Sequence, residues 1–582
     1  MGKTTCALDC YDGCSVIYED GKLKGDFDHP FTQGVLCPSL NGFLKTKRVT
    51  KPTFNGNEIT MDKALEILST TLKQNQNKES LFFKGNANMG KMQNVSNLFF
   101  QKYGSTFTKG SLCDGAGDAG VISGRGLNLA LPISQIKKSD VIVIWGRNIS
   151  TTNSHMMDII KDKTLIVIDP VKTKIAKLAD VHLQLRPRSD FSLAILFTRF
   201  VSLEDMEDLE FIKKHCEEFD YFVDFFRSFG IKKLYDEIDV RVDDVMRTLF
   251  LMKGKKVSFL VGVGVQKYIN GDEVLRAIDS FAAMLGLFGK EGCGVSYISD
   301  SSAGFANPFS HKNKTVPMPT VDFSKFKTVF IQGSNPCEQM PNSFKVCEEL
   351  NKSEFTIYFG LYENETSKIA NLVIPAKTFL EKDDIRFSYG SEYIGKMPKI
   401  LENDFAISEY DLTHYLNAEF GYEALKSENE YLEEIFNSNS ILKDGYYQSA
   451  SYEKIPYEDG FYTDDEKFIF MDEIYSKNNL LNEKGYYLIT PKSKHSINSQ
   501  FKIDNYLYLS STLGFKDSEF VKASSTYGES IFEVRVDENL REDLILIHSG
   551  AKGVNRLTPS LKSDEGDSAV FQEVKVKLER VV

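Results

Sequence analysis

Residues 140–155 read DVIVIWGRNISTTNSH, an apolar run that ends at a glycine and continues as a polar loop. The same pattern recurs at residues 328–342, TVFIQGSNPCEQMPN. Each junction is followed by a further apolar run, TLIVIDP at 164–170 and FTIYFG at 355–360, which predicts strands buried in a parallel sheet. Because ligands bind at the carboxyl ends of such strands, we expect two α/β domains with two similar nucleotide sites.

A third glycine-containing junction is weaker. The segment VGVGVQKYINGDEVLRAIDSF at residues 261–281 places Gly262 and Gly264 before a predicted helix. It lacks the third glycine of the G-x-G-x-x-G dinucleotide fingerprint. Gly262 is therefore either a cofactor contact or part of a tight strand-to-helix turn.

Four cysteines lie near the N-terminus: Cys6, Cys10 and Cys14 in CALDCYDGC, and Cys37 in CPS. Four thiolates suit a [4Fe–4S] cluster if a hairpin brings the fourth cysteine back to the first three. Zinc also accepts four cysteines, but its ligands usually follow a C-x2-C spacing. We expect a [4Fe–4S] cluster, with a zinc site or unligated thiols as alternatives.

The remaining pattern predicts an α/β multidomain protein with a small β-rich iron–sulfur cap, two doubly wound α/β domains and a C-terminal β-barrel. The segment MDKALEILSTTLKQ at 61–74 has helical periodicity, whereas strand-like runs such as YLYLSSTL at 506–513 dominate the last hundred residues. Residues 425–478 are acidic and rich in tyrosine, which favours a surface excursion. The expected units are the [4Fe–4S] cap at 1–51, one α/β domain at 52–135 and 303–424, the dinucleotide-binding domain at 136–302, the excursion at 425–478 and the barrel at 479–582.

Composition excludes some classes of partner. The 582 residues carry a formal net charge of −12, which argues against a nucleic-acid partner because phosphate binding needs a basic face. No apolar run approaches the ~18–20 residues of a membrane span, and the opening MGKTTC does not resemble a signal segment. Nine cysteines, an odd number, speak against a disulfide framework. We expect a cytoplasmic protein without direct membrane insertion.

Ten segments of the chain resemble, in the same order, those of the molybdopterin oxidoreductases of the dimethyl-sulfoxide-reductase type. CALDCYDGC is similar to the C-P-x-D-C-x-D-x-C opening of one branch, and GSLCDGAGDAGV at 110–121 is similar to the segment that carries the metal ligand. Other matching segments are WGRNISTTNSH, LRPRSDFSLA, GSNPCEQMPN and GVNRLTP. The resemblance covers nearly the whole chain.

This resemblance implies four domains around molybdenum or tungsten, bound by bis-molybdopterin guanine dinucleotide. The positions that match one dinucleotide site are Gly146, Arg147, Asn148, Asp169 and Asp190. Those that match the other site are Gly333, Asn335, Pro336 and Thr366, and Asn498 and Asn555 would close over the pterins. Asp190 could instead cap the helix predicted to begin at FSLAILF.

Cys113 matches the family's metal ligand, and Asp114 beside it matches a catalytic position. A thiolate before a small-residue helix is a soft ligand suited to this metal. Ser111 and Asp114 are alternative ligands, and a buried free thiol is the alternative role for Cys113. His155 is expected to have a structural hydrogen-bonding role. The other cysteines are expected to be separate core or loop thiols: Cys216, Cys293, Cys337 and Cys347.

Three positions depart from the family pattern. Ser39 stands where many members have a lysine between cluster and pterin, so the electron path is expected to differ. Asp114 stands where formate dehydrogenases have histidine, which disfavours formate as the substrate. Gly360 and Asn371 stand where the second dinucleotide site often has aspartates, which weakens the second guanine contact.

The resemblance implies an enzyme that performs a two-electron redox reaction or oxygen-atom transfer on a small molecule. Its cluster would pass single electrons to an electron-transfer protein or subunit. Two alternatives remain open: a non-redox hydratase or hydroxyltransferase that uses the same metal as a Lewis acid, and a pterin-free electron-relay subunit.

Overall fold

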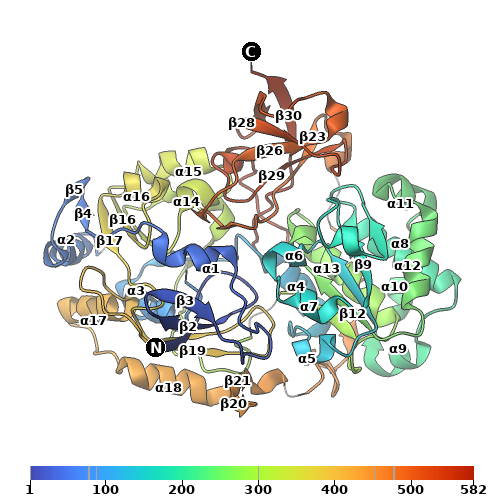
Figure 1. Cartoon of the computed structure of the whole chain (residues 1–582), viewed down its shortest axis with the longest axis horizontal. Coiled ribbons are helices and arrows are strands. Elements are labelled where there is room, and N and C mark those ends of the chain that lie inside the picture. Colours follow the sequence, from blue (N-terminus) through green and yellow to red (C-terminus); the bar gives the residue numbers. More distant parts are fainter. Residues whose placement is uncertain are drawn as a thin grey trace.

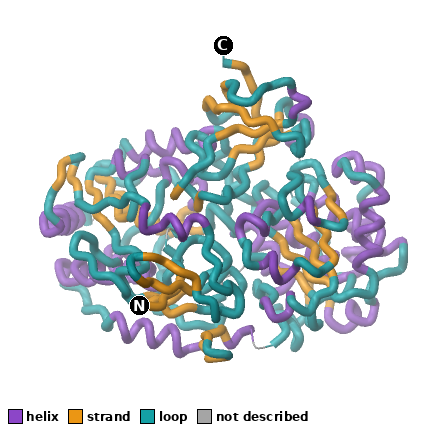
Figure 2. Tube along the Cα trace, viewed as in Figure 1, coloured by secondary structure: helices purple, strands orange, loops and turns teal. Residues whose placement is uncertain are grey.

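The computed structural model describes residues 2–76, 79–86, 88–298, 301–452, 454–475 and 479–581. The domains that hold the two larger sheets lie side by side, with the cap in front of the left-hand domain and the barrel above, at the end marked C (Figure 1). Helices surround both sheets, while the barrel is almost entirely strand and loop (Figure 2).

The five-stranded sheet has the order β10-β9-β8-β12-β13, and all of its strand pairs are parallel. Its central strand β8 alternates between two cores: Val141, Val143 and Trp145 face one, and Ile142 and Ile144 face the other. This alternation explains the continuous apolar run, because a strand covered on both faces has no solvent side. The strands are β8 (Val141–Trp145), β9 (Thr164–Ile168), β10 (Val181–Leu183), β12 (Val257–Val261) and β13 (Gly294–Ser296).

Helices cover both faces of this sheet. They are α5 (Ile133–Ile136), α6 (Ile149–Thr152), α7 (Met156–Ile160), α8 (Asp190–Leu203), α9 (Leu209–His215), α10 (Phe219–Arg227), α11 (Ile231–Ile238), α12 (Val242–Met252) and α13 (Gly271–Met284).

The eight-stranded sheet has the order β14-β7-β6-β15-β16-β17-β4-β5 and is parallel up to β17. Helix α2 (Met61–Gln74) begins at Thr60, whose hydroxyl accepts a 3.2 Å bond from Lys63 N, and its buried face starts at Ala64. The strands are β4 (Thr53–Phe54), β5 (Asn57–Glu58), β6 (Ser80–Lys84), β7 (Thr106–Lys109), β14 (Thr315–Pro317), β15 (Thr328–Gln332), β16 (Phe355–Gly360) and β17 (Leu372–Pro375). Its other helices are α3 (Ser96–Tyr103), α14 (Pro336–Gln339), α15 (Ser343–Leu350), α16 (Glu365–Ile369) and α17 (Glu409–Phe420).

The cap and the barrel complete the architecture. The cap is an antiparallel sheet of β1 (Gly2–Thr5), β2 (Ser15–Glu19) and β3 (Lys22–Gly25), followed by α1 (Pro38–Gly42). The C-terminal barrel is closed, with the order β23-β29-β26-β28-β27-β30. Its strands are β23 (Tyr486–Ile489), β26 (Tyr506–Leu509), β27 (Phe520–Ser524), β28 (Glu529–Val536), β29 (Leu544–Ile547) and β30 (Lys575–Arg580).

Helix α4 (Gly115–Arg125) connects the two sheets. It follows β7 of the eight-stranded sheet, yet it packs against α13 beside the five-stranded sheet. Gly120 makes this close packing possible, because a Cβ there would lie 2.2 Å from the carbonyl oxygen of Asp272. The segment before α4, which contains Cys113, therefore lies between the two sheets.

The segment at 425–478 differs from the expected surface excursion. Its first part is exposed in places, with α18 (Glu428–Asn439), β20 (Ser440–Lys443) and β21 (Tyr446–Ser449). Its second part enters the core of the five-stranded domain, where Tyr457, Phe461 and Phe468 are buried. There β22 (Phe468–Ile469) pairs with β11 (Cys216–Glu217). The prediction failed here because it used the average acidity of the segment, which does not show that single aromatic residues face inward.

Two of the cysteines expected to be separate thiols are joined. Cys337 in α14 and Cys347 in α15 form a disulfide, with their Cα atoms 5.1 Å apart. The prediction of isolated thiols was wrong for this pair, because the turn between the two helices brings residues ten positions apart together. Cys216 and Cys293 are buried free thiols, as predicted.

Candidate active site

A large cavity lies where the cap, both sheets and the barrel meet. It encloses about 3790 Å³ of empty space, including the part open to solvent. The predicted site residues that line it are Cys10, Cys37, Ser111, Cys113, Asp114, Gly146, Arg147, Asn148, Asp169, Asp190, Gly262, Asn498 and Asn555. Residues from positions 10 to 555 thus converge on one space.

The four N-terminal cysteines lie together at the cap end of this cavity. Cys6 and Cys14 are buried, and Cys6 N donates a 2.8 Å bond to Cys14 O across the hairpin. Cys37 returns at the start of α1, where its Sγ accepts a 3.4 Å bond from Leu40 N. Burial and the neighbouring thiols raise the pKa of Cys14, as they do for Cys6. The hairpin predicted from the sequence therefore does bring the fourth cysteine to the other three.

Arg386 supports the cysteine loop and was not identified from the sequence. It lies on β18 (Asp384–Arg386), is 1% exposed and donates a 2.7 Å bond to Cys10 O. Its positive charge favours the thiolate form of Cys6 and Cys10. No local motif marks this arginine, because its partner lies 376 residues away.

His155 has the structural position expected for it. Its Nδ1 lies 2.6 Å from Asp12 Oδ2, and its Nε2 lies 3.0 Å from Val35 O. Burial would lower the pKa of His155, but the bonds to Asp12 and Val35 raise it above its ordinary value. The imidazole joins the two segments that carry Cys10, Cys14 and Cys37.

Ser111 shapes the loop around Cys113. Its Oγ accepts bonds of 3.0–3.1 Å from the backbone N–H groups of Cys113, Asp114 and Gly115, and donates a 3.1 Å bond to Asp114 Oδ1. A hydroxyl used in this way at the start of α4 is poorly placed to bind a metal. The thiol of Cys113 remains the soft donor of the loop, and burial followed by Asp114 raises its pKa to about 11.

Two lysines place positive charge beside Cys113. Lys267 Nζ donates a 2.8 Å bond to Cys113 O, and Lys492 comes from the loop after β23 of the barrel. The charges of Lys267 and Lys492 both favour the thiolate of Cys113.

Asp9 completes a polar group that faces Cys113. Tyr389 donates a 2.5 Å bond to Asp9 Oδ1, Asn498 donates a 2.8 Å bond to Oδ2, and Lys492 Nζ lies 3.8 Å from Oδ2. Burial would raise the pKa of Asp9, but Lys492 and these two donors hold it below its ordinary value. Asp9, Tyr389 and Lys492 were missed from the sequence because they come from three separate segments.

Three charged residues, Arg147, Asp169 and Asp190, line the cavity at or near the first strand-to-loop junction. Arg147 is buried, lies 4.9 Å from the ring centre of Tyr11, and makes no salt bridge with any residue in the described ranges. Asp190 Oδ1 accepts a 2.7 Å bond from Trp145 Nε1, and burial raises the pKa of Asp190 to about 6. Burial also raises the pKa of Asp169 to about 7. Ser189 occupies the N-cap of α8, so the alternative of Asp190 as the N-cap residue was wrong.

Gly262 has a clear structural role. A Cβ at Gly262 would lie 2.4 Å from Gly146 O and 2.6 Å from Arg147 Cβ. Only glycine permits the end of β12 to approach the first junction so closely. This supports the tight-turn interpretation, although Gly262 also lines the cavity.

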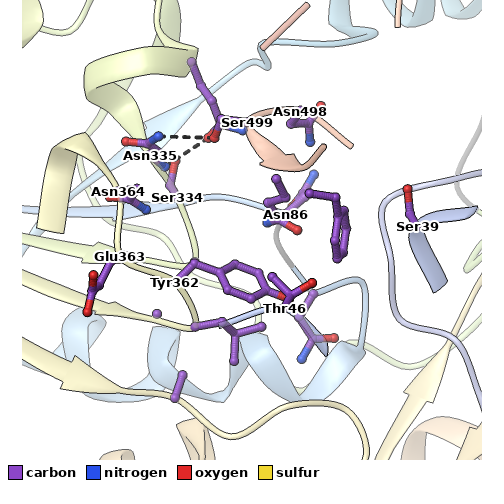
Figure 3. Close-up of a pocket in the computed structure, with 18 of the residues that line it drawn as sticks. Ser39, Thr46, Asn86, Ser334, Asn335, Tyr362, Glu363, Asn364, Asn498 and Ser499 are labelled. Carbon is purple, nitrogen blue, oxygen red and sulfur yellow. Dashed lines mark hydrogen bonds between the residues drawn. The ribbon is translucent and has the colours of Figure 1, made fainter. Parts of the chain in front are cut away.

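The second junction lines a separate pocket, with about 1840 Å³ of empty space including open solvent. In Figure 3, Asn335, Tyr362 and Asn364 surround it from the eight-stranded domain, and Asn498 and Ser499 approach from the C-terminal region. Asn335 Nδ2 donates a 3.2 Å bond to Ser499 Oγ. Gly333 also lines the pocket.

Two residues predicted for this second site, Thr366 and Pro336, do not line the pocket themselves. Thr366 donates a 2.8 Å bond to Asn335 Oδ1. Asn371 Oδ1 accepts a 2.8 Å bond from Thr356 N, whereas Gly360 lines the pocket. The carboxylate of Glu363, three residues after Gly360 at the end of β16, also lines this pocket, as does Glu409.

Comparison with known proteins identifies the family to which this chain belongs. The model of the molybdopterin oxidoreductase family matches residues 48–391. The chain belongs to the molybdopterin oxidoreductase family. This confirms the predicted membership, and with it an oxidoreductase that uses a molybdopterin cofactor with molybdenum or tungsten.

Individual relatives are distant. The probable oxidoreductase YyaE of Bacillus subtilis is 26% identical over 81% of this chain and 78% of its own length. The F420-dependent formate dehydrogenase subunit alpha of Methanocaldococcus jannaschii is 26% identical over 65% of this chain and 63% of its own length.

The acetylene hydratase from Pelobacter acetylenicus has a similar solved structure, with a TM-score of 0.81 and 15% identity over the full length of both chains. This likeness confirms the predicted α/β multidomain fold with a C-terminal barrel. Across the described ranges, no helix combines the length and apolar character needed to cross a bilayer.

Proposed function

We propose that this oxidoreductase holds molybdenum or tungsten between two pterin guanine dinucleotides, next to a [4Fe–4S] cluster. The observation that carries the proposal is the shared cavity, which is lined by Cys10 and Cys37 at one end and by Cys113 and the first junction farther along. Bound there, the metal would exchange two electrons or an oxygen atom with a small substrate, and the cluster would carry single electrons to a protein partner.

The residues at the first junction fit a dinucleotide. Arg147, without a carboxylate partner in the described ranges, can bind a diphosphate, and the buried carboxylate of Asp190 can accept hydrogen bonds from a guanine edge. Gly146 has φ of +57°, a left-handed conformation that lets the chain turn sharply where β8 ends. Asp169, which is half-buried, would contact the same ligand.

At the second pocket we assign Gly333 and Asn335 to the other dinucleotide, with Pro336 and Thr366 holding the loop in shape. Asn498 lines both the pocket and the main cavity, so it can contact both halves of the cofactor. Asn555 lines the main cavity and donates a 2.6 Å bond to Glu338 O, which ties the barrel to the loop after Asn335.

The cysteine spacing favours a cluster over zinc. Cys6, Cys10 and Cys14 follow C-x3-C spacings, whereas zinc ligands usually follow C-x2-C. Four neighbouring thiolates suit a [4Fe–4S] cluster, in which each iron takes one thiolate.

The electron route can be tested with Cys37→Ser in protein purified without oxygen. The variant should lose visible absorption, cluster iron and viologen-linked turnover while keeping its molybdenum or tungsten, because a hydroxyl is a poor cluster ligand. Cys216→Ser, which changes an isolated buried thiol, is the matched control. Unchanged iron content in Cys37→Ser would refute the assignment.

A further inference from the structure

One part of the cavity wall carries positive charge that the proposed function does not use. Lys84 ends β6, and both Lys84 and His311 line the same cavity as Cys113. Phe82 and Phe107 line the cavity there too, and the ring of His311 stacks on Phe107 with centroids 3.8 Å apart. Strand β7, which carries Phe107, leads at its carboxyl end into the Cys113 loop.

Lys84 lacks a carboxylate partner. Its Nζ donates a hydrogen bond to Asn94 Oδ1, and the described residues include no salt bridge to it. Glu409 is the acidic group whose charge reaches Lys84, but Glu409 is already paired with Lys382. Burial, followed by the charge of Lys91, lowers the pKa of Lys84 to about 8. An ammonium held in this way is stabilised by any anion that enters the cavity.

His311 places a ring nitrogen with unused hydrogen-bonding capacity in the same cavity wall. Its Nδ1 is buried and has no hydrogen-bond partner within the described ranges. In the tautomer protonated at Nδ1, this atom can donate to an oxygen. Burial lowers the pKa of His311, and the charge of Lys84 lowers it further. The ring of Phe107, on which His311 stacks, also packs edge-on against Phe82, two residues before Lys84.

We propose that Lys84 and His311 form a binding site for a small oxyanion on the path to Cys113, so that the enzyme selects anionic over neutral substrates. The ammonium supplies charge, the imidazole supplies one directed hydrogen bond, and Phe82 and Phe107 provide an apolar wall. This inference rests on the proposed function only in placing the site on the substrate path.

The test is calorimetric titration of the oxidised holoenzyme with nitrate, sulfate and neutral dimethyl sulfoxide, with no electron donor present. Lys84→Gln should weaken binding of the preferred anion about tenfold, the change expected for ~1.4 kcal/mol, and leave dimethyl sulfoxide unaffected. Lys84→Arg should restore most of the affinity. As a control, Lys102→Gln removes a lysine on α3 that pairs with Glu423. This variant should bind the anions as the unaltered protein does.

Equal anion affinity in the unaltered protein and Lys84→Gln would overturn the proposal, and so would the absence of nitrate and sulfate binding to the unaltered protein. Metal analysis of the same samples separates the two hypotheses. Anion binding that depends on Lys84 in a protein without molybdenum or tungsten would support this site and refute the proposed function. Full metal content together with anion affinity that does not depend on Lys84 would refute this site and leave the proposed function standing.

Discussion

At the scale of single residues, chemical type alone could not choose among the donors near Cys113. The sequence left Ser111 and Asp114 as alternative ligands to Cys113, and the structure gives the hydroxyl of Ser111 a different role. Ser111 Oγ is engaged with three backbone N–H groups and with Asp114, so the hydroxyl serves the loop itself. Such hydrogen bonds depend on backbone angles that a linear motif does not specify.

This difference predicts opposite results for two neighbouring substitutions. Cys113→Ala should abolish turnover and lower molybdenum or tungsten content while leaving cluster iron unchanged, because it removes the soft donor. Ser111→Ala should keep the metal and lower stability by about 1 kcal/mol, the usual effect of losing a helix-start hydroxyl. Metal analysis and thermal unfolding measure both. Full metal in Cys113→Ala together with metal loss in Ser111→Ala would move the ligand to Ser111.

Asp190 presents a similar choice between holding the fold and binding the cofactor. Asp190→Ala leaves Trp145 Nε1 buried without its acceptor, which costs roughly 1–3 kcal/mol whichever role is correct. Trp145→Phe removes the same bond but leaves the carboxylate. We expect both variants to melt at lower temperature and only Asp190→Ala to release less guanine nucleotide on acid denaturation. Equal nucleotide from both variants would limit Asp190 to a structural role.

At the scale of elements, the strands were predictable and the packing of irregular segments was not. Val141–Trp145 and Thr328–Gln332 are strands as expected, because a strand buried on both faces must be apolar throughout. By contrast, Tyr457 and Phe468 lie in an acidic stretch whose average composition suggested a surface. Periodicity reports regular elements, whereas single aromatic residues that fill a neighbouring core leave no periodic signal.

The turn before Cys37 carries a pH dependence that depends on His29. The Nδ1 of this buried side chain accepts bonds from Phe31 N at 3.3 Å and Thr32 N at 3.1 Å, so it must be unprotonated. Burial, with the charges of Lys3 and His155, lowers the pKa of His29 to about 4 against the opposing charge of Asp26. The neutral imidazole therefore stabilises the folded turn above the ordinary pKa of about 6.5, and this stability is lost as pH falls toward 4.

At pH 5 the loss should be about 2 kcal/mol for the segment at 26–36, relative to pH 7. Hydrogen exchange of that segment, corrected for the intrinsic rate at each pH, measures it. His29→Gln cannot titrate and should show a much smaller change between the two pH values. The same loss in both proteins would exclude His29 as its source.

At the scale of the whole molecule, the sequence predicted which segments carry the site but not how they meet. The family match and the barrel were expected, and both are confirmed. The contacts that bring Asp9, Tyr389 and Lys492 around Cys113 join three parts of the chain, and the hydrogen bond from Arg386 to Cys10 O joins two. Contacts of this range depend on domain docking, which no local spacing encodes.

The central claim is that one cavity holds the metal, two guanine dinucleotides and the neighbouring cluster. Cofactor stoichiometry of the chain purified without oxygen tests this most directly, by metal analysis and by guanine nucleotide released with acid. We predict about four iron atoms, about one molybdenum or tungsten atom and about two guanine nucleotides per chain. Iron without molybdenum, tungsten or guanine would contradict the account and identify the chain as an electron-relay protein.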